Sequence, residues 1–217
     1  MTADHAHDRP GPLAHHFTEL EQQSDSVKMG MWIFLLTEIL LFGGLFVAYT
    51  VFRAWNEEMF INAHKFLDIY LGTINTIVLI SSSATVALAI RAVQIGDRRK
   101  AVILLTATLA LAVVFLVVKY FEYSHKFHLG QLPGKYYTFT GVEGSNPHIF
   151  FGIYFATTGL HGLHVLGGII VLGWMLFRTA RGDFSPEYHT PLEAAGLYWH
   201  LVDMIWIYLF PLLYLIG

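Results

Sequence analysis

Long apolar runs separated by shorter polar segments dominate the pattern of the chain. A helix of about 20 apolar residues crosses a hydrocarbon core of about 30 Å, and each run reaches that length. In lipid every backbone polar group must be satisfied internally, which favours helices for such runs. The pattern therefore predicts an all-α, polytopic membrane protein with five transmembrane helices in one bundle, over residues of about 29–52, 69–91, 101–122, 148–177 and 196–216.

Composition supports this class. Of 217 residues, 55% are hydrophobic and 13% are charged, whereas soluble domains carry about 25% charged residues. The net charge of −3 argues against a nucleic-acid partner. The absence of cysteine excludes disulfides, thiolate metal sites and cysteine nucleophiles.

Residues 1–28 are expected to form a mobile cytoplasmic tail before a bundle over 29–217. The tail is polar and has no apolar core of a signal peptide, so the first helix is expected to act as an uncleaved insertion signal. Its four histidines could bind a metal loosely, but a solvated tail is the favoured interpretation; they are His5, His7, His15 and His16.

The basic residues predict the orientation. With the N-terminus in the cytoplasm, the cytoplasmic segments hold eight Lys and Arg residues and the outer segments hold five. The short, dense turn Gly96-Asp-Arg-Arg-Lys100 weighs most, because short loops determine orientation. The N-terminus is therefore predicted inside and the C-terminus outside.

Glu38 is the first candidate for function, because it lies in the middle of the first apolar run. At a rise of about 1.5 Å per residue, it lies about 14 Å inside the membrane from Met29. An ionisable side chain at this depth costs a few kcal/mol on insertion scales. We therefore expect Glu38 to face protein or water rather than lipid.

Two histidines occur in the fourth run. His161 and His164 are three residues apart, so they share one face of a helix. Interhelical hydrogen bonds are the favoured interpretation over metal or haem ligation. A bis-histidine haem needs ligands on opposing helices, and His200 of the fifth run keeps that alternative open.

Other polar residues are expected to have structural or lipid-contact roles. His200 and Asp203 can pair near the cytoplasmic end, and Lys119 can extend toward the outer surface and pair with Glu122. Glu193 lies just before the last apolar run and is placed in the same class.

Small residues predict close helix contacts. Three groups suggest such seams: Ser81-Ser82-Ser83, Gly43-Gly44 and Gly167-Gly168. The turn-rich segment 123–147 is expected to cap the outer face of the bundle. No nucleophile–base arrangement, phosphate loop or convincing set of metal ligands emerges, so the residues alone identify no reaction.

Several motifs together resemble subunit III of the haem-copper cytochrome c and quinol oxidases. They occur in that family's order from about residue 29 to the end: Trp32-Ile-Phe-Leu-Leu-Thr-Glu38, Asn75-Thr76 with the serine run, Gly96-Asp-Arg-Arg-Lys100, Glu122-Tyr123, Gly159-Leu-His-Gly-Leu-His-Val165 and Tyr198-Trp-His-Leu-Val-Asp-Met-Ile-Trp206. Family members with seven helices form two bundles around a V-shaped lipid cleft. This chain departs from that pattern, since it has only the larger bundle, and the cleft needs a wall from another subunit.

The resemblance also implies a role. Subunit III carries no haem or copper, which are expected in partner subunits; it packs against the catalytic subunit I, stabilises it during turnover and supports proton uptake. Glu38 falls on the family's buried carboxylate, which reacts with a hydrophobic carbodiimide when protonated, and His161 or His164 would be its partner. The implied setting is a bacterial cell (inner) membrane, with phospholipids and a larger respiratory supercomplex as further partners.

Three alternatives stay open at this point. One is a haem b membrane quinol oxidoreductase that uses His161 or His164 with His200. Another is a subunit III homologue associated with nitric oxide reductase. The third is a small proton or cation transporter built on Glu38, against which the absence of internal repeats and of a continuous polar row counts.

Overall fold

The computed structural model describes residues 17–142 and 146–216. Within this part of the chain, five helices are long and apolar enough to cross a membrane, which confirms the predicted all-α class. They are α1 (Leu20–Trp55), α3 (Ile69–Gln94), α4 (Arg98–His128), α5 (His148–Arg181) and α6 (Thr190–Phe210). Four short elements complete the described part: α2 (Glu57–Ala63), η1 (His64–Phe66), η2 (Gly134–Tyr136) and η3 (Pro211–Leu215), the last a π-helical turn.

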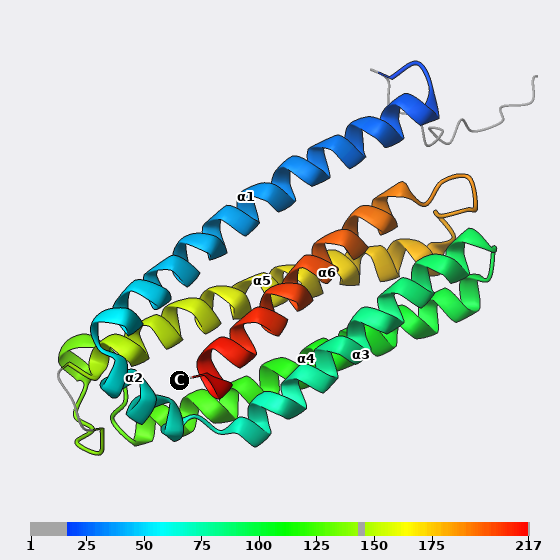
Figure 1. Cartoon of the computed structure of the whole chain (residues 1–217). Coiled ribbons are helices and arrows are strands. Elements are labelled where there is room, and N and C mark those ends of the chain that lie inside the picture. The colour runs from blue at the N-terminus through cyan, green and yellow to red at the C-terminus, as the bar shows by residue number, and fades with distance from the viewer. Residues whose placement is uncertain (1–16, 143–145, 217) are drawn as a thin grey trace, which may run out of the picture.

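The five long helices run side by side along one axis (Figure 1). The α3–α4 hairpin forms one side of the bundle and α1 forms the opposite side. Between them, α6 contacts α1, α3 and α5, while α5 also contacts α4. Among the long helices, α1 packs mainly against α5 and α6, so much of its apolar surface faces outward.

Local sequence signals define several helix ends. Asp68 precedes α3, and its carboxylate accepts hydrogen bonds from the backbone N–H groups of Tyr70 and Leu71 at 2.9 and 3.1 Å. Asp97 precedes α4 and accepts from the N–H of Lys100 at 3.0 Å. Such side chains satisfy backbone donors that have no partner inside the helix. Gly182 ends α5 with φ 85°, a left-handed conformation that favours glycine.

The helices extend beyond the apolar runs that predict them. Helix α1 begins at Leu20 rather than near residue 29, so the last part of the expected tail is helical; the four tail histidines lie outside the described residues. With 36 residues α1 is about 54 Å long, more than a hydrocarbon core requires. Likewise α4 continues to His128 and α6 starts at Thr190. An apolar run indicates only the part of a helix that lies in the hydrocarbon core, and the helix can continue into the headgroup region or the water beyond it.

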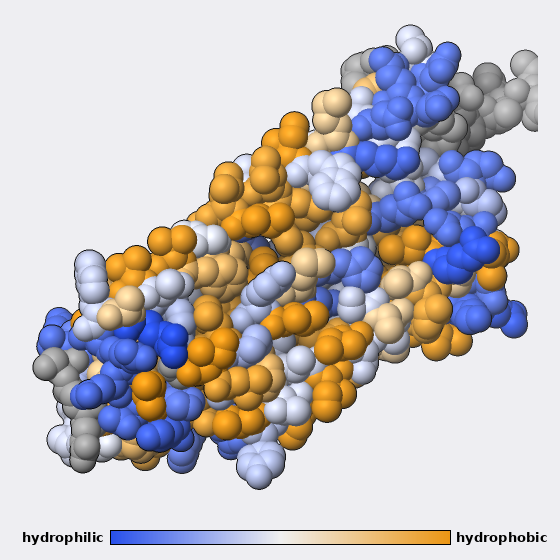
Figure 2. Space-filling model, in the orientation of Figure 1, coloured by the Kyte–Doolittle hydropathy of each residue, from blue (hydrophilic) through white to orange (hydrophobic). Residues whose placement is uncertain are grey.

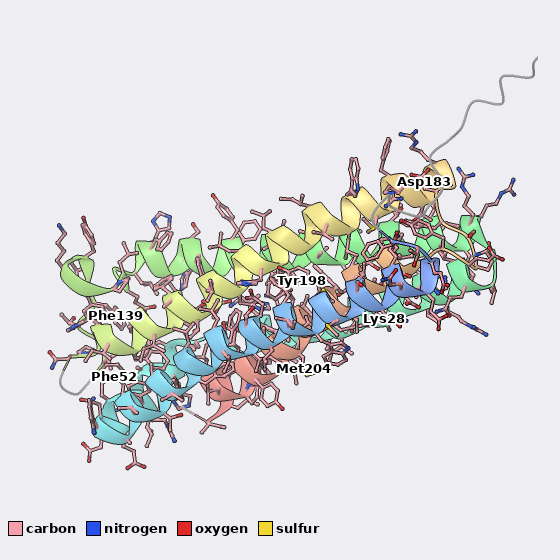
Figure 3. All side chains as sticks on the ribbon, turned by 90° about the horizontal axis from the view of Figure 1, so that it is seen from above. Lys28, Phe52, Phe139, Asp183, Tyr198 and Met204 are labelled. Atoms are coloured by element: carbon pink, nitrogen blue, oxygen red, sulfur yellow. The ribbon has the colours of Figure 1, made fainter. Side chains whose placement is uncertain are left out.

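The surface has the distribution expected of a membrane protein. Apolar residues cover the middle of the bundle and polar residues gather at both ends (Figure 2). Figure 3 places Lys28 and Asp183 at one end and Phe52 and Phe139 at the other. Exposed aromatic side chains lie near both ends, as at the two membrane–water interfaces: Trp32 and Trp174 toward one, and Trp55, Tyr70 and Tyr120 toward the other.

Two of the three predicted small-residue seams form. Ser82 of α3 accepts a hydrogen bond from the indole Nε1 of Trp199 in α6 at 3.1 Å. At Gly168 of α5, an added Cβ would lie 2.5 Å from Cζ3 of the same tryptophan. The expectation for Gly43 and Gly44 is wrong within this chain, because no atom lies within 4 Å of a Cβ added at either position. They belong to the outward surface of α1.

The described part of the outer loop packs on the bundle, in agreement with the predicted cap. Gln131 and Val142 are buried, and the Tyr137 ring lies 5.7 Å from the ring of Phe151 at the start of α5. Burial raises the pKa of Tyr137 above its ordinary value.

Candidate functional site

Glu38 of α1 pairs with His164 of α5. The carboxylate oxygen Oε2 lies 2.8 Å from the ring nitrogen Nε2, and the two side chains are 14% and 16% exposed. The other ring nitrogen, Nδ1, lies 2.8 Å from the carbonyl oxygen of Leu160. Of the two histidines that sequence reasoning left open, the structure places His164 against the carboxyl.

These contacts determine how protons are distributed in the pair. A carbonyl oxygen only accepts, so Nδ1 of His164 carries a hydrogen and donates it to Leu160. If the imidazole is neutral, Nε2 is then an acceptor and the carboxyl of Glu38 must be the protonated donor. If the imidazole is charged, Glu38 is ionised. In either case one proton is shared between Nε2 and Oε2, and the pair carries no net charge.

Neighbouring side chains hold this pair in position. The Phe42 ring meets the His164 ring edge-on, with 5.1 Å between centroids. Tyr198 of α6 donates its hydroxyl hydrogen to the carbonyl oxygen of His164 at 3.0 Å, and Figure 3 shows it midway along the bundle. Three helices thus converge on the pair.

His161 takes no part in that pair. It is fully buried, and neither ring nitrogen has a hydrogen-bond partner among the described residues. Its ring lies against Phe115 of α4 and Trp206 of α6, at centroid distances of 5.5 and 5.2 Å. The favoured interpretation of two hydrogen-bonded histidines is therefore correct for His164 and wrong for His161.

The expected pairing of His200 with Asp203 is wrong. Nδ1 of His200 lies 2.7 Å from the hydroxyl of Ser83 in α3. Asp203 is buried, and in the described part of the chain its carboxylate makes no hydrogen bond of standard length and angle, although it lies near the same Ser83 hydroxyl. Two residues three positions apart on a helix point in similar but not identical directions, so they need not contact each other. His200 reaches the hydroxyl on the neighbouring helix, while Asp203 lies in the core.

Glu193 lies at the same end of the bundle as Lys28, in the first turn of α6. Its carboxylate accepts a hydrogen bond from the side-chain amide of Gln94 at 3.0 Å and lies 3.1 Å from Nε2 of His189. It links the end of α3 to the start of α6, which fits the structural role expected from the sequence.

A second polar cluster lies toward the opposite end of the bundle, in the last turns of α4. Lys119 and Glu122 of α4 pair at 2.9 Å, as predicted, but Lys119 is only 8% exposed. The ammonium does not extend to the surface. It donates to the hydroxyl of Tyr214 at 2.7 Å and lies 4.6 Å from the centre of the Trp206 ring.

Two tyrosines complete the cluster around Glu122. Oε1 of Glu122 accepts hydrogen bonds from Tyr154 of α5 at 2.8 Å and from Tyr214 of η3 at 2.6 Å. Sequence reasoning missed both tyrosines. A tyrosine within an apolar segment is the sequence feature that could have indicated them, since a buried hydroxyl requires a polar partner.

A second lysine adds positive charge to this region. Lys126, one helical turn beyond Glu122, is also buried and donates to the backbone carbonyl of Phe66 at 3.3 Å. Two lysines thus accompany one buried carboxylate in the last turns of α4. None of the described residues forms a group of three or more His, Cys, Asp or Glu side chains that could hold a metal ion.

The fold and these clusters define a multi-pass helical membrane protein with several ionisable side chains inside its bundle, two sets of which are paired. The chain belongs to the cytochrome c oxidase subunit III family, whose model, "Cytochrome c oxidase subunit III", matches residues 13–217. It is therefore a subunit III of the haem-copper oxidase class, and the haem b quinol oxidoreductase alternative is not favoured.

Relatives with this description span most of the chain. The cytochrome c oxidase subunit 3 of Thermostichus vulcanus is 33% identical over 217 residues, covering 100% of this chain and 93% of the relative. That of Synechocystis is 34% identical over 192 residues, covering 86% and 74%. A "Heme-copper oxidase subunit I+III" of Aeropyrum pernix is 29% identical over 203 residues, covering 88% of this chain and 23% of the relative. Family membership implies association with a subunit I.

Proposed function

We propose that the chain is a non-catalytic subunit of a proton-pumping terminal oxidase in aerobic respiration, where it stabilises subunit I and supports proton uptake. The observation that carries the proposal is the Glu38–His164 pair inside the bundle, in which Oε2 lies 2.8 Å from Nε2, so that the two atoms can share a proton. Apolar surroundings favour the neutral form of such a pair over separated charges, so it can keep that proton without a charged partner. A carboxyl of this kind suits proton handling or helix packing rather than electron transfer.

The redox centres belong, in this proposal, to partner subunits, and this chain binds neither haem nor copper. Support comes from how two of its three intramembrane histidines are used. Nε2 of His164 faces Glu38 and Nδ1 of His200 faces Ser83. Both side chains already hold helices together.

We place the N-terminus in the cytoplasm and the C-terminus outside, in a bacterial cell membrane. The basic turn Arg98-Arg-Lys100 lies at the same end of the bundle as Lys28 and Asp183 (Figures 1 and 3). Positively charged short loops stay on the cytoplasmic side, which supports this orientation.

Phospholipids and a larger respiratory supercomplex are proposed as further partners. A groove of ≈ 520 Å³ near the inner end lies between α1, α5 and α6. Its walls are mostly apolar and include Met31, Phe34, Val171 and Ala195. An acyl chain fits this lining, and the outward surface of α1 is available to another subunit.

The test uses the assembled oxidase with Glu38→Gln in this chain. We expect the initial rate of oxygen reduction to stay close to that of the parent complex. Proton uptake, or the number of turnovers before inactivation, should change modestly. Complete loss of oxygen reduction in a complex that retains its haem spectrum would contradict the supporting role.

A further inference from the structure

Three buried polar side chains in the middle of the bundle make no hydrogen bond of standard geometry among the described residues. Asn75 of α3 and His161 of α5 are 0% exposed, and Asp203 of α6 is 2% exposed. Both amide atoms of Asn75 and both ring nitrogens of His161 lack a partner, and the Asp203 carboxylate makes no hydrogen bond of standard length and angle, although the Ser83 hydroxyl lies near enough to interact with it. Leaving a buried polar group unpaired costs about 1–3 kcal/mol, and such groups are nearly always bonded to protein or to ordered water.

Trp206 contacts or adjoins the helix segments that carry these three side chains. Its ring lies 5.2 Å from the His161 ring, and its Nε1 donates to the hydroxyl of Thr76, the neighbour of Asn75, at 3.0 Å. Asp203 precedes Trp206 by three residues, about one helical turn. We call the part of the bundle around Trp206 that carries these three residues the Trp206 layer.

This layer lies between the two polar clusters. On one side, His164 follows His161 by one turn of α5 and bonds to Glu38. On the other, the Lys119 ammonium lies 4.6 Å from the centre of the Trp206 ring and bonds to Glu122. His161 is thus the ionisable group placed between the two pairs along the axis of the bundle.

We propose that the layer formed by Asn75, His161 and Asp203 binds internal water, which joins the Glu38–His164 pair and the Lys119–Glu122 cluster in one hydrogen-bonded chain. Water matches these side chains because it both donates and accepts. The imidazole and the amide each offer a donor and an acceptor, and a carboxyl can offer both. Buried water typically makes about three hydrogen bonds, which groups from three converging helices can supply.

Such a chain has a physical consequence. A proton can pass along hydrogen-bonded water between two ionisable pairs without a bare side-chain charge crossing the apolar core. The water site does not depend on Glu38 supporting proton uptake, since it rests on the unsatisfied groups around Trp206. It can be present even if the two pairs serve only to hold helices together.

The first test is a map of the whole purified oxidase at a resolution that shows ordered water. We expect water within about 3 Å of a ring nitrogen of His161 and of the polar atoms of Asn75 or Asp203. The variant His161→Gln, which can still bond to water, should keep density in the layer, and His161→Leu should lose the water at that position. His125→Leu, on the exposed side of α4, is the matched control and should leave the layer unchanged.

A second measurement reads the contact with water in the parent complex itself and uses a variant only to identify the signal. Magnetisation transfer from water to the ring nitrogens can be followed by solid-state NMR in the parent complex labelled with ¹⁵N-histidine. The His161 signal is identified by its loss in His161→Gln. We expect transfer to His161 comparable to that reaching exposed His125. A His161 ring that receives no magnetisation from water, or a map in which it contacts protein groups only, overturns the proposal.

Discussion

Replacing Glu122 by leucine should be among the most destabilising single changes in the bundle. Glu122 is 3% exposed and accepts hydrogen bonds from Lys119, Tyr154 and Tyr214. Glu122→Leu removes the acceptor and leaves the Lys119 ammonium buried without its counter-charge. Tyr214 lies in η3, so the same change also removes one of the two hydrogen bonds that join the C-terminal turn to α4.

The magnitude follows from the geometry of the pair. Breaking a buried ion pair by removing one partner costs about 3–5 kcal/mol, because the remaining charge is uncompensated. Replacing both partners by apolar residues of similar volume is often neutral. Glu122→Leu should therefore lower the free energy of unfolding by about 3–5 kcal/mol. Adding Lys119→Met should recover part of that loss, because the unpaired charge is gone while the hydroxyls of Tyr154 and Tyr214 still lack their acceptor.

The assay is unfolding of the purified chain in mixed detergent micelles with increasing SDS. Thr106→Val is a suitable control on the same helix, because its exposed hydroxyl bonds only to the carbonyl of Val102 in its own turn. It should change the free energy by no more than about 0.5 kcal/mol. If the double variant is less stable than Glu122→Leu, the reasoning about an uncompensated charge is wrong.

Three further predictions concern the helix contacts and the acid of α1. Gly168→Ala places a Cβ 2.5 Å from Trp199 and should lower the stability of the folded chain by about 1–3 kcal/mol. Gly43→Ala adds a methyl group in open space and should leave the stability unchanged. The temperature at which the chain dissociates from the complex measures both effects. Ser82→Asp buries an unpaired charge on the α3–α6 seam and should sharply reduce the yield of assembled complex, so a normal yield would contradict tight packing there. Glu38→Gln should leave that yield nearly intact, because glutamine can still bond to His164; a large loss would assign the pair mainly to packing.

The sequence was a good guide to the helices because bilayer thickness fixes how long an apolar run must be. It did not predict where α1 begins or where α4 ends, since both helices continue beyond their apolar runs and no hydropathy signal marks those termini. It did not predict α2 either, a seven-residue helix in the first outer segment.

The polar sites were only partly predictable. Spacing along one helix correctly paired Lys119 with Glu122, because both partners lie on α4. Contacts between helices depend on how each helix is rotated about its axis, which spacing does not reveal. Hence the choice between His161 and His164 stayed open, and His200 was assigned to Asp203 rather than to Ser83. The predicted helix contact at Gly43 was wrong for a related reason: a small residue does not show whether its contact lies within the chain or with another subunit.

The most direct test of the central claim is purification of the tagged chain from its native membrane, followed by a reduced-minus-oxidised spectrum. The account predicts that subunit I copurifies and that the haem signal belongs to this complex. Once the chain is separated from its partners, its own spectrum should be flat. A redox-active signal that stays with the isolated chain, or a chain that copurifies with no oxidase subunit, would contradict the account.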